Sequence, residues 1–221
     1  MDAYTLLQNA LATDPGRPLL TMYDDHPAPG SERIELSVAT FANWIAKTAN
    51  YLLDELMLEP GEPVAVPLPP HWQTAVMQVA VLAAGGHVTA GAARITCWAD
   101  GTSLPDDPQV EEIVGFALRP MGLGFTPANP APPGVLDYAV DVRGHGDRFT
   151  PRHPQADLDL APLNERVLTD RLDPLLSALA GGGSLVLCRR PDPAALAHRA
   201  EVERVTATLG LDVAGLPRLD A

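Results

Sequence analysis

The 221-residue sequence has little positive charge and little cysteine, and both shortages argue against whole classes of function. Lysine occurs once, at Lys47, and 15 Lys and Arg residues stand against 28 Asp and Glu, for a formal net charge of -13. A chain this acidic repels polyphosphate backbones, so we expect no nucleic-acid partner. Cys97 and Cys188 lie in unrelated contexts without a CxxC motif. We therefore predict free thiols in a reducing cytoplasm, with neither a disulfide framework nor a thiolate zinc site.

Long apolar runs are also missing. The best one, residues 75–86, contains Gln78 and is much shorter than the roughly 20 residues that a membrane-spanning helix needs. The N-terminal stretch MDAYTLLQNALATD is acidic and interrupted by polar residues, and it lacks the basic region of a signal peptide. These features predict a cytoplasmic protein that does not associate with membranes.

Nucleotide-binding glycine motifs are absent as well, although Gly181, Gly182 and Gly183 are consecutive. A phosphate-binding turn follows a strand and precedes the N-terminus of a helix. The three glycines have the reverse order, and a helix C-terminus presents carbonyl groups and the negative end of the dipole. Val186 stands where GxGxxG requires its last glycine, and no GxxxxGK[ST] motif includes Lys47. We interpret the glycines as a helix C-cap before a strand.

What the sequence does contain is the alternation of helical and extended patterns that is typical of an α/β protein. The pattern predicts a short helix over residues 4–12. The extended runs PLLTMYDD and ERIELS follow, joined by HPAPG, which has hairpin composition. Ser37 has the character of an N-cap for a long amphipathic helix that ends before Pro60-Gly61.

Two segments then repeat the order helix, glycines, strand. In the first, the strand PVAVPL precedes a helix over residues 71–84, Gly85-Gly86 and the strand HVTA. In the second, a helix over residues 164–180 leads through the three glycines to the strand SLVLC and a further helix, DPAALAHRAEVERV. A βαβ unit implies parallel strands with a helix packed on the sheet. We therefore predict an α/β fold, a layered sheet with parallel βαβ units and flanking helices.

The domain prediction is a single α/β domain over residues 1–221. Residues 1–98 and 164–221 form two similar halves, and residues 99–163 form a divergent, loop-rich insert rich in Pro, Gly and Asp. Within the insert only VEEIVGFAL and VLDYAVDV have regular patterns. The prolines of residues 119–134 predict an irregular loop.

Two groups of residues are candidate ligand contacts. His71 and Trp72 open a helix that follows a strand, where α/β proteins often bind ligands, and the helix polarity should lower the pKa of His71. His145 and Asp147 share the loop RGHGDRFTPRHP with His153, in a spacing that matches no metal-ligand motif. Packing for Trp72 and solvation for the loop residues are the alternatives. We predict no metal ion, and no motif of the GxSxG or HExxH kind assigns a catalytic residue.

A long N-terminal stretch resembles the N-terminal segment of AMP-forming adenylating enzymes, the family of acyl-CoA synthetases and nonribosomal adenylation domains. The stretch is LTMYDD…ERIELSVATFANWIAKTANYLLDELMLEPGEPVAVPLPPHWQTAVMQVAVLAAGG. The later run LLSALAGGGSLVLCRRPDPAALAHRAEVERVTA is similar to a second segment of the same family. More narrowly, LSVATFANWIAKTANYLLDEL and LPPHW resemble a family of short actinobacterial proteins related to these synthetases. The resemblance implies a fold like part of the N-terminal domain of adenylating enzymes.

The sequence departs from that family in the parts that handle ATP. The Ser/Thr/Gly-rich loop ending in Pro-Lys-Gly has no counterpart, since GTSLPDD is only a faint echo without lysine. The family's tyrosine- and glutamate-bearing motif, its ribose-binding aspartate motif and its lysine-bearing C-terminal domain also find no match. Adenylation requires positive charge on the separating phosphates. We therefore predict a catalytically incompetent, truncated relative without a cofactor and with a binding, regulatory or assembly role.

Two alternatives stay open at this point. One is an enzyme or ligand-binding protein with a new site for a small acyl or CoA-like molecule, built from His71, His145 and Asp147. The other is a subunit whose missing half comes from another chain. We also expect a homodimer or a partner protein, because the apolar helix around residues 75–84 would lack the further layers that cover it in the related enzymes. The alternative is that residues 99–163 fold back over this helix.

Overall fold

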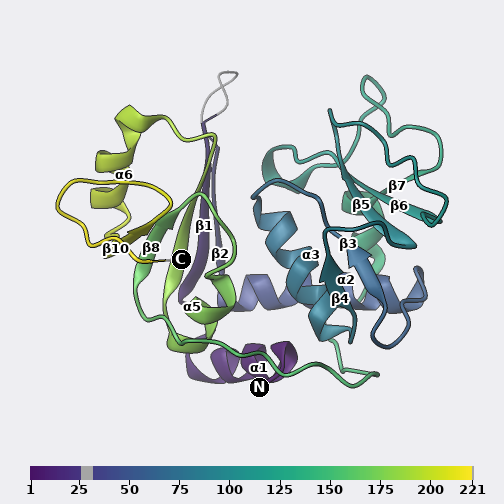
Figure 1. Cartoon of the computed structure of the whole chain (residues 1–221), viewed down its shortest axis with the longest axis horizontal. Helices are drawn as coiled ribbons and strands as arrows, with labels where there is room; N and C mark the ends of the chain where they lie inside the picture. The colour runs from purple at the N-terminus through teal and green to yellow at the C-terminus, as the bar shows by residue number, and fades with distance from the viewer. Residues whose placement is uncertain (26–31, 221) are drawn as a thin grey trace. The chain divides into compact units, whose positions relative to one another are not determined.

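The computed structural model describes residues 1–25 and 32–220, and their contacts group into two compact units (Figure 1). Unit 1 comprises Met1–Tyr4, Ala42–Pro69 and Gln73–Leu158, and unit 2 comprises Thr5–Phe41, Pro70–Trp72 and Asp159–Ala221. Within the described residues each unit is built on a five-stranded sheet. The single domain expected over residues 1–221 stays a prediction.

The sheet of unit 2 has the strand order β10-β8-β9-β1-β2. Its strands are β1 (Pro18–Asp24), β2 (Glu32–Ser37), β8 (Arg166–Thr169), β9 (Ser184–Arg189) and β10 (Ala207–Leu209). Strands β10, β8, β9 and β1 run parallel, whereas β2 is antiparallel to β1. The antiparallel pair confirms the pairing expected of a hairpin, and the HPAPG segment lies outside the described residues.

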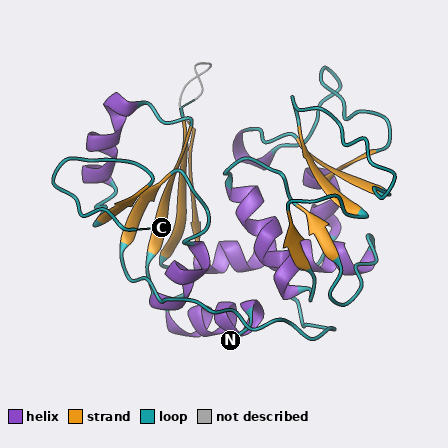
Figure 2. Cartoon of the chain, in the orientation of Figure 1, coloured by secondary structure: helices purple, strands orange, loops and turns teal. Residues whose placement is uncertain are grey.

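The helices α5 (Leu175–Gly181) and α6 (Leu196–Val202) accompany this sheet, and α1 (Ala3–Thr13) matches the predicted N-terminal helix (Figure 2). One face of the sheet carries an apolar core. Leu168, Val186 and Cys188 pack there with Leu196 and Ala200 of α6.

The sheet of unit 1 has the order β4-β3-β5-β6-β7, and all of these pairs are parallel. Its strands are β3 (Pro63–Ala65), β4 (His87–Thr89), β5 (Ile95–Ala99), β6 (Glu112–Phe116) and β7 (Val135–Asp137). The helices are α2 (Val38–Asp54), α3 (Trp72–Ala83) and α4 (Tyr138–Asp141), with 3-10 turns η1 (Pro120–Gly122), η2 (Val142–Gly144) and, in unit 2, η3 (Pro193–Ala195). The order β3-α3-β4 with parallel strands confirms the predicted βαβ unit. Both sheets together confirm the predicted α/β fold.

Helix starts and ends follow the local chemistry of the sequence. The backbone N–H of Thr40 donates to the Ser37 hydroxyl at 3.1 Å, which confirms Ser37 as the N-cap of α2. Gly182, with φ of 81°, caps α5 directly before β9, and Gly85, with φ of 90°, lies between α3 and β4. The C-cap interpretation of Gly181 to Gly183 is therefore confirmed.

Some predicted boundaries were wrong. The helix expected over residues 164–180 begins only at Leu175, because Arg166–Thr169 is strand β8. The short strands β5 and β10 carried no signal that periodicity could separate from other apolar runs. The loop expected over residues 119–134 contains the turn η1, in which Met121 takes a positive φ of 59°. In the part of the chain that the structure describes, no helix has both the length and the apolar character to cross a membrane.

Candidate functional site

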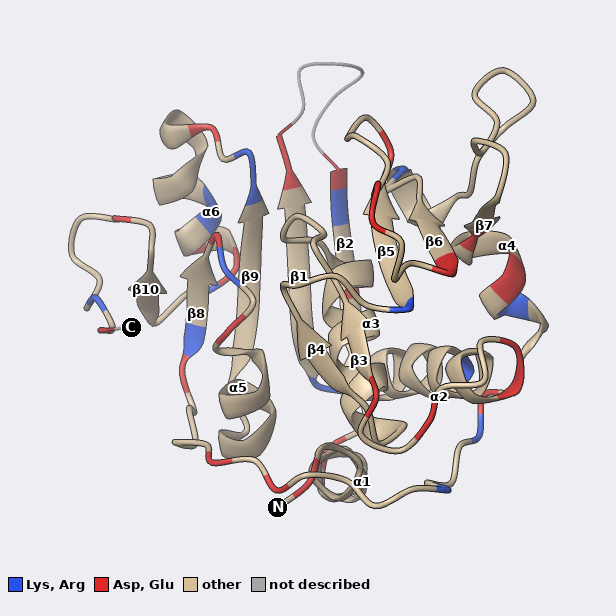
Figure 3. Ribbon diagram, turned by 45° about the vertical axis from the view of Figure 1, so that its right-hand side comes forward, with Lys and Arg blue, Asp and Glu red and all other residues tan. Residues whose placement is uncertain are grey.

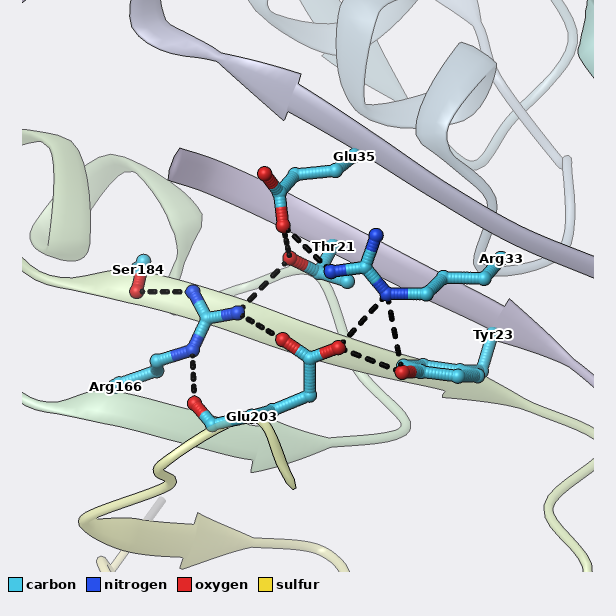
Figure 4. Close-up of polar contacts among 7 residues, drawn as sticks. All are labelled: Thr21, Tyr23, Arg33, Glu35, Arg166, Ser184 and Glu203. Atoms are coloured by element: carbon cyan, nitrogen blue, oxygen red, sulfur yellow. Dashed lines mark hydrogen bonds and ion pairs between the residues drawn. The ribbon is translucent and has the colours of Figure 1, made fainter. Parts of the chain in front are cut away.

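A cluster of polar side chains occupies one face of the unit 2 sheet (Figure 4). Side chains alternate between the faces of a strand, so Thr21 and Tyr23 of β1 point to the same side. Arg33 and Glu35 of β2 pair across from them, since Tyr23 is opposite Arg33 and Thr21 is opposite Glu35. The first residues of β8 and β9, Arg166 and Ser184, and Glu203 at the end of α6 complete the cluster.

Glu203 is the centre of this cluster and is only 7% exposed. Its carboxylate accepts hydrogen bonds from the Tyr23 hydroxyl at 2.6 Å, from Arg33 Nε at 2.8 Å and from Arg166 Nη2 at 2.5 Å. Burial by itself raises the pKa of Glu203, but the hydrogen bonds from Arg33, Tyr23 and Arg166 outweigh it and lower the pKa to about 2. A carboxylate that is ionised and fully occupied in this way is a poor general base at neutral pH.

Arg166 holds three strands and α6 together. Its Nε donates to the Glu203 carbonyl at 2.6 Å, its Nη1 to the Ser184 hydroxyl at 3.0 Å and its Nη2 to the Thr21 hydroxyl at 3.0 Å. Glu35 accepts from Arg33 Nη2 at 2.7 Å and from the Thr21 hydroxyl at 3.2 Å. Both carboxylates of the cluster are therefore committed to partners within the chain.

A cavity of about 420 Å³ adjoins this cluster at the start of strands β1, β8 and β9. Its charged lining consists of Arg17, Glu35, Arg166, Glu203 and Arg204. Since β1, β8 and β9 are parallel, the cavity lies at the amino-terminal edge of the sheet, opposite the edge at which open α/β sheets usually bind ligands.

The carboxyl-terminal edge of the same sheet holds ion pairs. Figure 3 shows acidic residues at the end of β1 beside a basic residue at the end of β9. Asp24 accepts from Arg189 Nη1 at 3.1 Å and from Arg190 Nε at 2.9 Å. Asp25 accepts from Arg199 Nη2 at 2.8 Å. Burial raises the pKa of Asp25, but its hydrogen bonds from Arg199 and from the Asp192 backbone outweigh burial and lower that pKa.

His71 and Trp72 are assigned to unit 2 and do not form an open site. Both residues are buried, at 0% and 1% exposure, with their ring centroids 5.8 Å apart. Burial, assisted by the charge of Arg189, lowers the pKa of His71 to about 3. The predicted direction of the shift is confirmed, but burial rather than helix polarity is its main cause.

His145 and Asp147 belong to unit 1, whereas His71 and Trp72 belong to unit 2. The polar stripe of α2 binds the loop of His145 and Asp147. Lys47 Nζ donates to the His145 carbonyl at 2.6 Å, and Asn50 Nδ2 donates to the carbonyls of Gly146 at 3.1 Å and Arg148 at 2.9 Å.

The side chains of the two loop residues differ in their surroundings. His145 Nε2 lies 2.9 Å from Glu55 Oε1, whereas Asp147 is exposed. Within residues 1–25 and 32–220, no three His, Cys, Asp or Glu side chains are grouped so that they could hold a metal ion. A ligand role for His71, Trp72, His145 or Asp147 stays a prediction.

The cluster around Glu203 is not predictable from sequence motifs. Alternation along β1 and β2 could have placed Thr21, Tyr23, Arg33 and Glu35 on one face. No spacing rule joins these residues to Arg166 or Glu203, which lie more than a hundred residues later in the chain.

Comparison with known proteins gives one close relative in sequence. The chain is 36% identical over 239 residues to a "TIGR03089 family protein" of Mycobacterium tuberculosis, and the match covers 92% of this chain and 96% of the relative. No family model matches the chain.

Solved structures share its fold at low identity. An acetoacetyl-CoA synthetase from Streptomyces lividans matches with a TM-score of 0.70 at 18% identity, covering 95% of this chain and 42% of the synthetase. An acyl-CoA synthetase from Brucella canis matches with a TM-score of 0.71 at 12% identity, covering 95% of this chain and 47% of that one. An amide bond synthetase from Marinactinospora thermotolerans matches with a TM-score of 0.59 at 16% identity, covering 95% and 48% of the two chains. The chain therefore spans less than half the length of these enzymes.

Proposed function

The chain belongs to the TIGR03089 family, and we propose that it is a relative of adenylating enzymes that does not adenylate and instead has a binding or regulatory role. It shares the fold of the N-terminal part of those enzymes but spans only part of their length. The synthetase and amide bond synthetase activities named for the solved relatives are not carried over.

The observation that supports this proposal most strongly is that arginines at the carboxyl-terminal edge of the unit 2 sheet form ion pairs within the chain. Adenylation needs cations on phosphate groups that separate in the transition state. Arg189 and Arg190 bind Asp24, and Arg199 binds Asp25. A guanidinium already paired with a buried carboxylate has little net charge left to offer a phosphate, and breaking the pair would leave a buried charge unpaired.

The single lysine of the sequence supports the same proposal. Lys47 lies on α2 in unit 1, where its ammonium group donates to the His145 carbonyl. Its position in an amphipathic helix differs from the Pro-Lys-Gly loop of adenylating enzymes, whose counterpart the sequence lacks. The charge of Lys47 is used to hold a loop.

Pyrophosphate release tests the proposal directly. The protein is incubated with ATP, Mg²⁺ and a panel of carboxylic acids, with heat-denatured protein as the blank and an active acyl-CoA synthetase as the positive control. We expect no release above the blank. We also expect millimolar ATP with Mg²⁺ to leave the melting temperature unchanged, because a ligand that binds only the folded state must raise it. Pyrophosphate above the blank, or a dose-dependent rise in melting temperature, would contradict the proposal.

A further inference from the structure

The cavity at the amino-terminal edge of the unit 2 sheet has a positive balance of charge. Its lining contains three arginines, Arg17, Arg166 and Arg204, against two glutamates, Glu35 and Glu203. This excess of cations occurs in a chain whose formal net charge is -13. Local positive charge in an acidic protein attracts small anions to one place on the surface.

Both glutamates of the cavity lining already accept hydrogen bonds from arginine side chains. Glu203 is occupied by Tyr23, Arg33 and Arg166, and Glu35 accepts from Arg33 as well. Arg33 thus adds a further cation beside the cavity lining.

The remaining two arginines form no ion pair within the described residues. Arg17 donates through Nη1 to the Gly183 carbonyl and through Nη2 to the Leu179 carbonyl at 3.4 Å, so it caps the end of α5. Arg204 is exposed, and its side chain has neither a hydrogen bond nor an ion pair with any described residue. Arg204 is therefore the cation that can turn toward a bound anion at the least cost.

The backbone at Arg204 provides an independent observation. Helix α6 ends in a Schellman motif, in which the Val205 N–H donates to the Ala200 carbonyl at 2.9 Å and the Arg204 N–H to the Glu201 carbonyl at 3.1 Å. Arg204 occupies the left-handed position of this motif, with φ of 52°, where glycine is usual. An arginine held in a strained conformation beside a cavity, with its guanidinium unpaired, is a feature expected of a functional site.

We propose that this cavity binds a small molecule that carries a carboxylate or phosphate group on a short apolar body, with Arg204 as its main contact. The hollow is shallow and open to solvent, and its volume of about 420 Å³ can hold a small molecule with one side exposed. Arg204 presents guanidinium donors to the oxyanion, while Val202, which is 58% exposed, and Pro18 supply apolar surface beside it. The proposal deepens the binding role above and rests on it.

Titration of the full chain with butyrate and with butyl phosphate tests the site, with butyramide as the neutral analogue. We expect the anions, and not butyramide, to bind at millimolar concentration and to bind more weakly as salt increases. The stronger of the two anions identifies the head group. Absence of binding by both anions, or equal binding of butyramide, would overturn the proposal.

Two substitutions separate the charge of Arg204 from its backbone strain. Arg204→Gln keeps the strain and removes the charge, so affinity should fall about tenfold or more with little change in melting temperature. Arg204→Gly removes both, so affinity should fall equally while the melting temperature rises by roughly 2 °C.

Arg218→Gln is the matched control, because Arg218 is an exposed arginine of unit 2 that pairs with Asp212 and does not line the cavity. It should retain wild-type affinity. Affinity retained in either Arg204 variant, or lost equally in Arg218→Gln, would refute the assignment. Pyrophosphate release would instead refute the non-adenylating role, and the anion titration would not register it.

Discussion

At the scale of single residues, the buried carboxylate of Glu203 connects several elements of unit 2. One carboxylate joins the end of α6 to Tyr23 and Arg33 of the β1–β2 pair and to Arg166 of β8. Its contacts come from three strands, β1, β2 and β8, so their loss is felt across the sheet. Arg33 and Arg166 would then share a region of the sheet face without the charge that separates them.

Glu203→Gln is expected to lower the free energy of unfolding by roughly 2–4 kcal/mol, because it leaves two arginines beside a neutral amide. Chemical denaturation at neutral pH measures the effect. Glu35→Gln is the control, since Glu35 is 36% exposed in its side chain and should cost less than about 1 kcal/mol. Equal stability of Glu203→Gln and the wild type would contradict the central role of this carboxylate.

The same residue predicts a dependence on pH. The pKa of Glu203 is lowered from 4.5 to about 2, so its contribution to stability is complete above the unfolded-state value and is lost as the pH falls toward 2. The difference in unfolding free energy between wild type and Glu203→Gln should be constant near neutral pH and shrink below pH 4.5. A difference that stays constant down to pH 2 would show that the pKa is not lowered in the folded state.

At the scale of elements, the glycines after α5 have separate tasks. Gly182 takes the left-handed conformation, with φ of 81°, and a Cβ built on it would meet no atom within 4 Å. A Cβ on Gly183 would lie 2.5 Å from the carbonyl oxygens of Glu165 and Leu163. Gly182, which also lines the cavity beside Arg204, therefore provides the left-handed backbone conformation, whereas Gly183 permits the close approach of the chain segment that leads into β8.

Alanine substitutions distinguish these tasks. Gly182→Ala should cost about 1 kcal/mol through backbone strain. Gly183→Ala should cost more, about 2–3 kcal/mol, because the backbone oxygens cannot move aside. Thermal and chemical denaturation of both variants provide the comparison. If Gly182→Ala kept wild-type stability but changed the affinity for a ligand, the C-cap role would be an incomplete account of this residue.

The polar stripe of helix α2 binds the histidine-bearing loop of unit 1. The stripe contains Lys47 and Asn50, which donate to carbonyls of the loop around His145. Asp54 at the end of the helix accepts from Arg152 at 2.6 Å. The stripe and the histidine-bearing loop are thus partners of each other within unit 1.

At the scale of the whole molecule, self-association stays a prediction. A dimer was expected to cover the apolar helix near residues 75–84, yet Ala75, Val76, Met77 and Val79 of α3 are each at most 2% exposed. That premise is therefore not met by the structure. Light scattering after size exclusion checks the prediction, for which a dimer requires twice the 23.4 kDa of one chain. A mass of one chain at micromolar concentration would contradict it.

Features that depend on near neighbours in the chain are predictable from local sequence. The long amphipathic helix α2, the N-cap at Ser37 and the glycine caps depend on side-chain spacing, hydrogen bonds and backbone angles within a few residues. The structure has all of them. The resemblance of two stretches of the sequence to adenylating enzymes also implied the fold of their N-terminal part, which the solved structures share.

Which charged side chains pair with each other depends on long-range packing. Arg166 and Glu203 reach Thr21, Tyr23 and Arg33 because the sheet places β8 and β9 beside β1, and strand order is a property of long-range packing. Local patterns likewise could not show that Asp24 and Asp25 bind arginines from a segment 160 or more residues later. A side chain's partner depends on register and strand order. Only the folded chain therefore shows which arginines form ion pairs and that Arg204 lies unpaired beside its cavity.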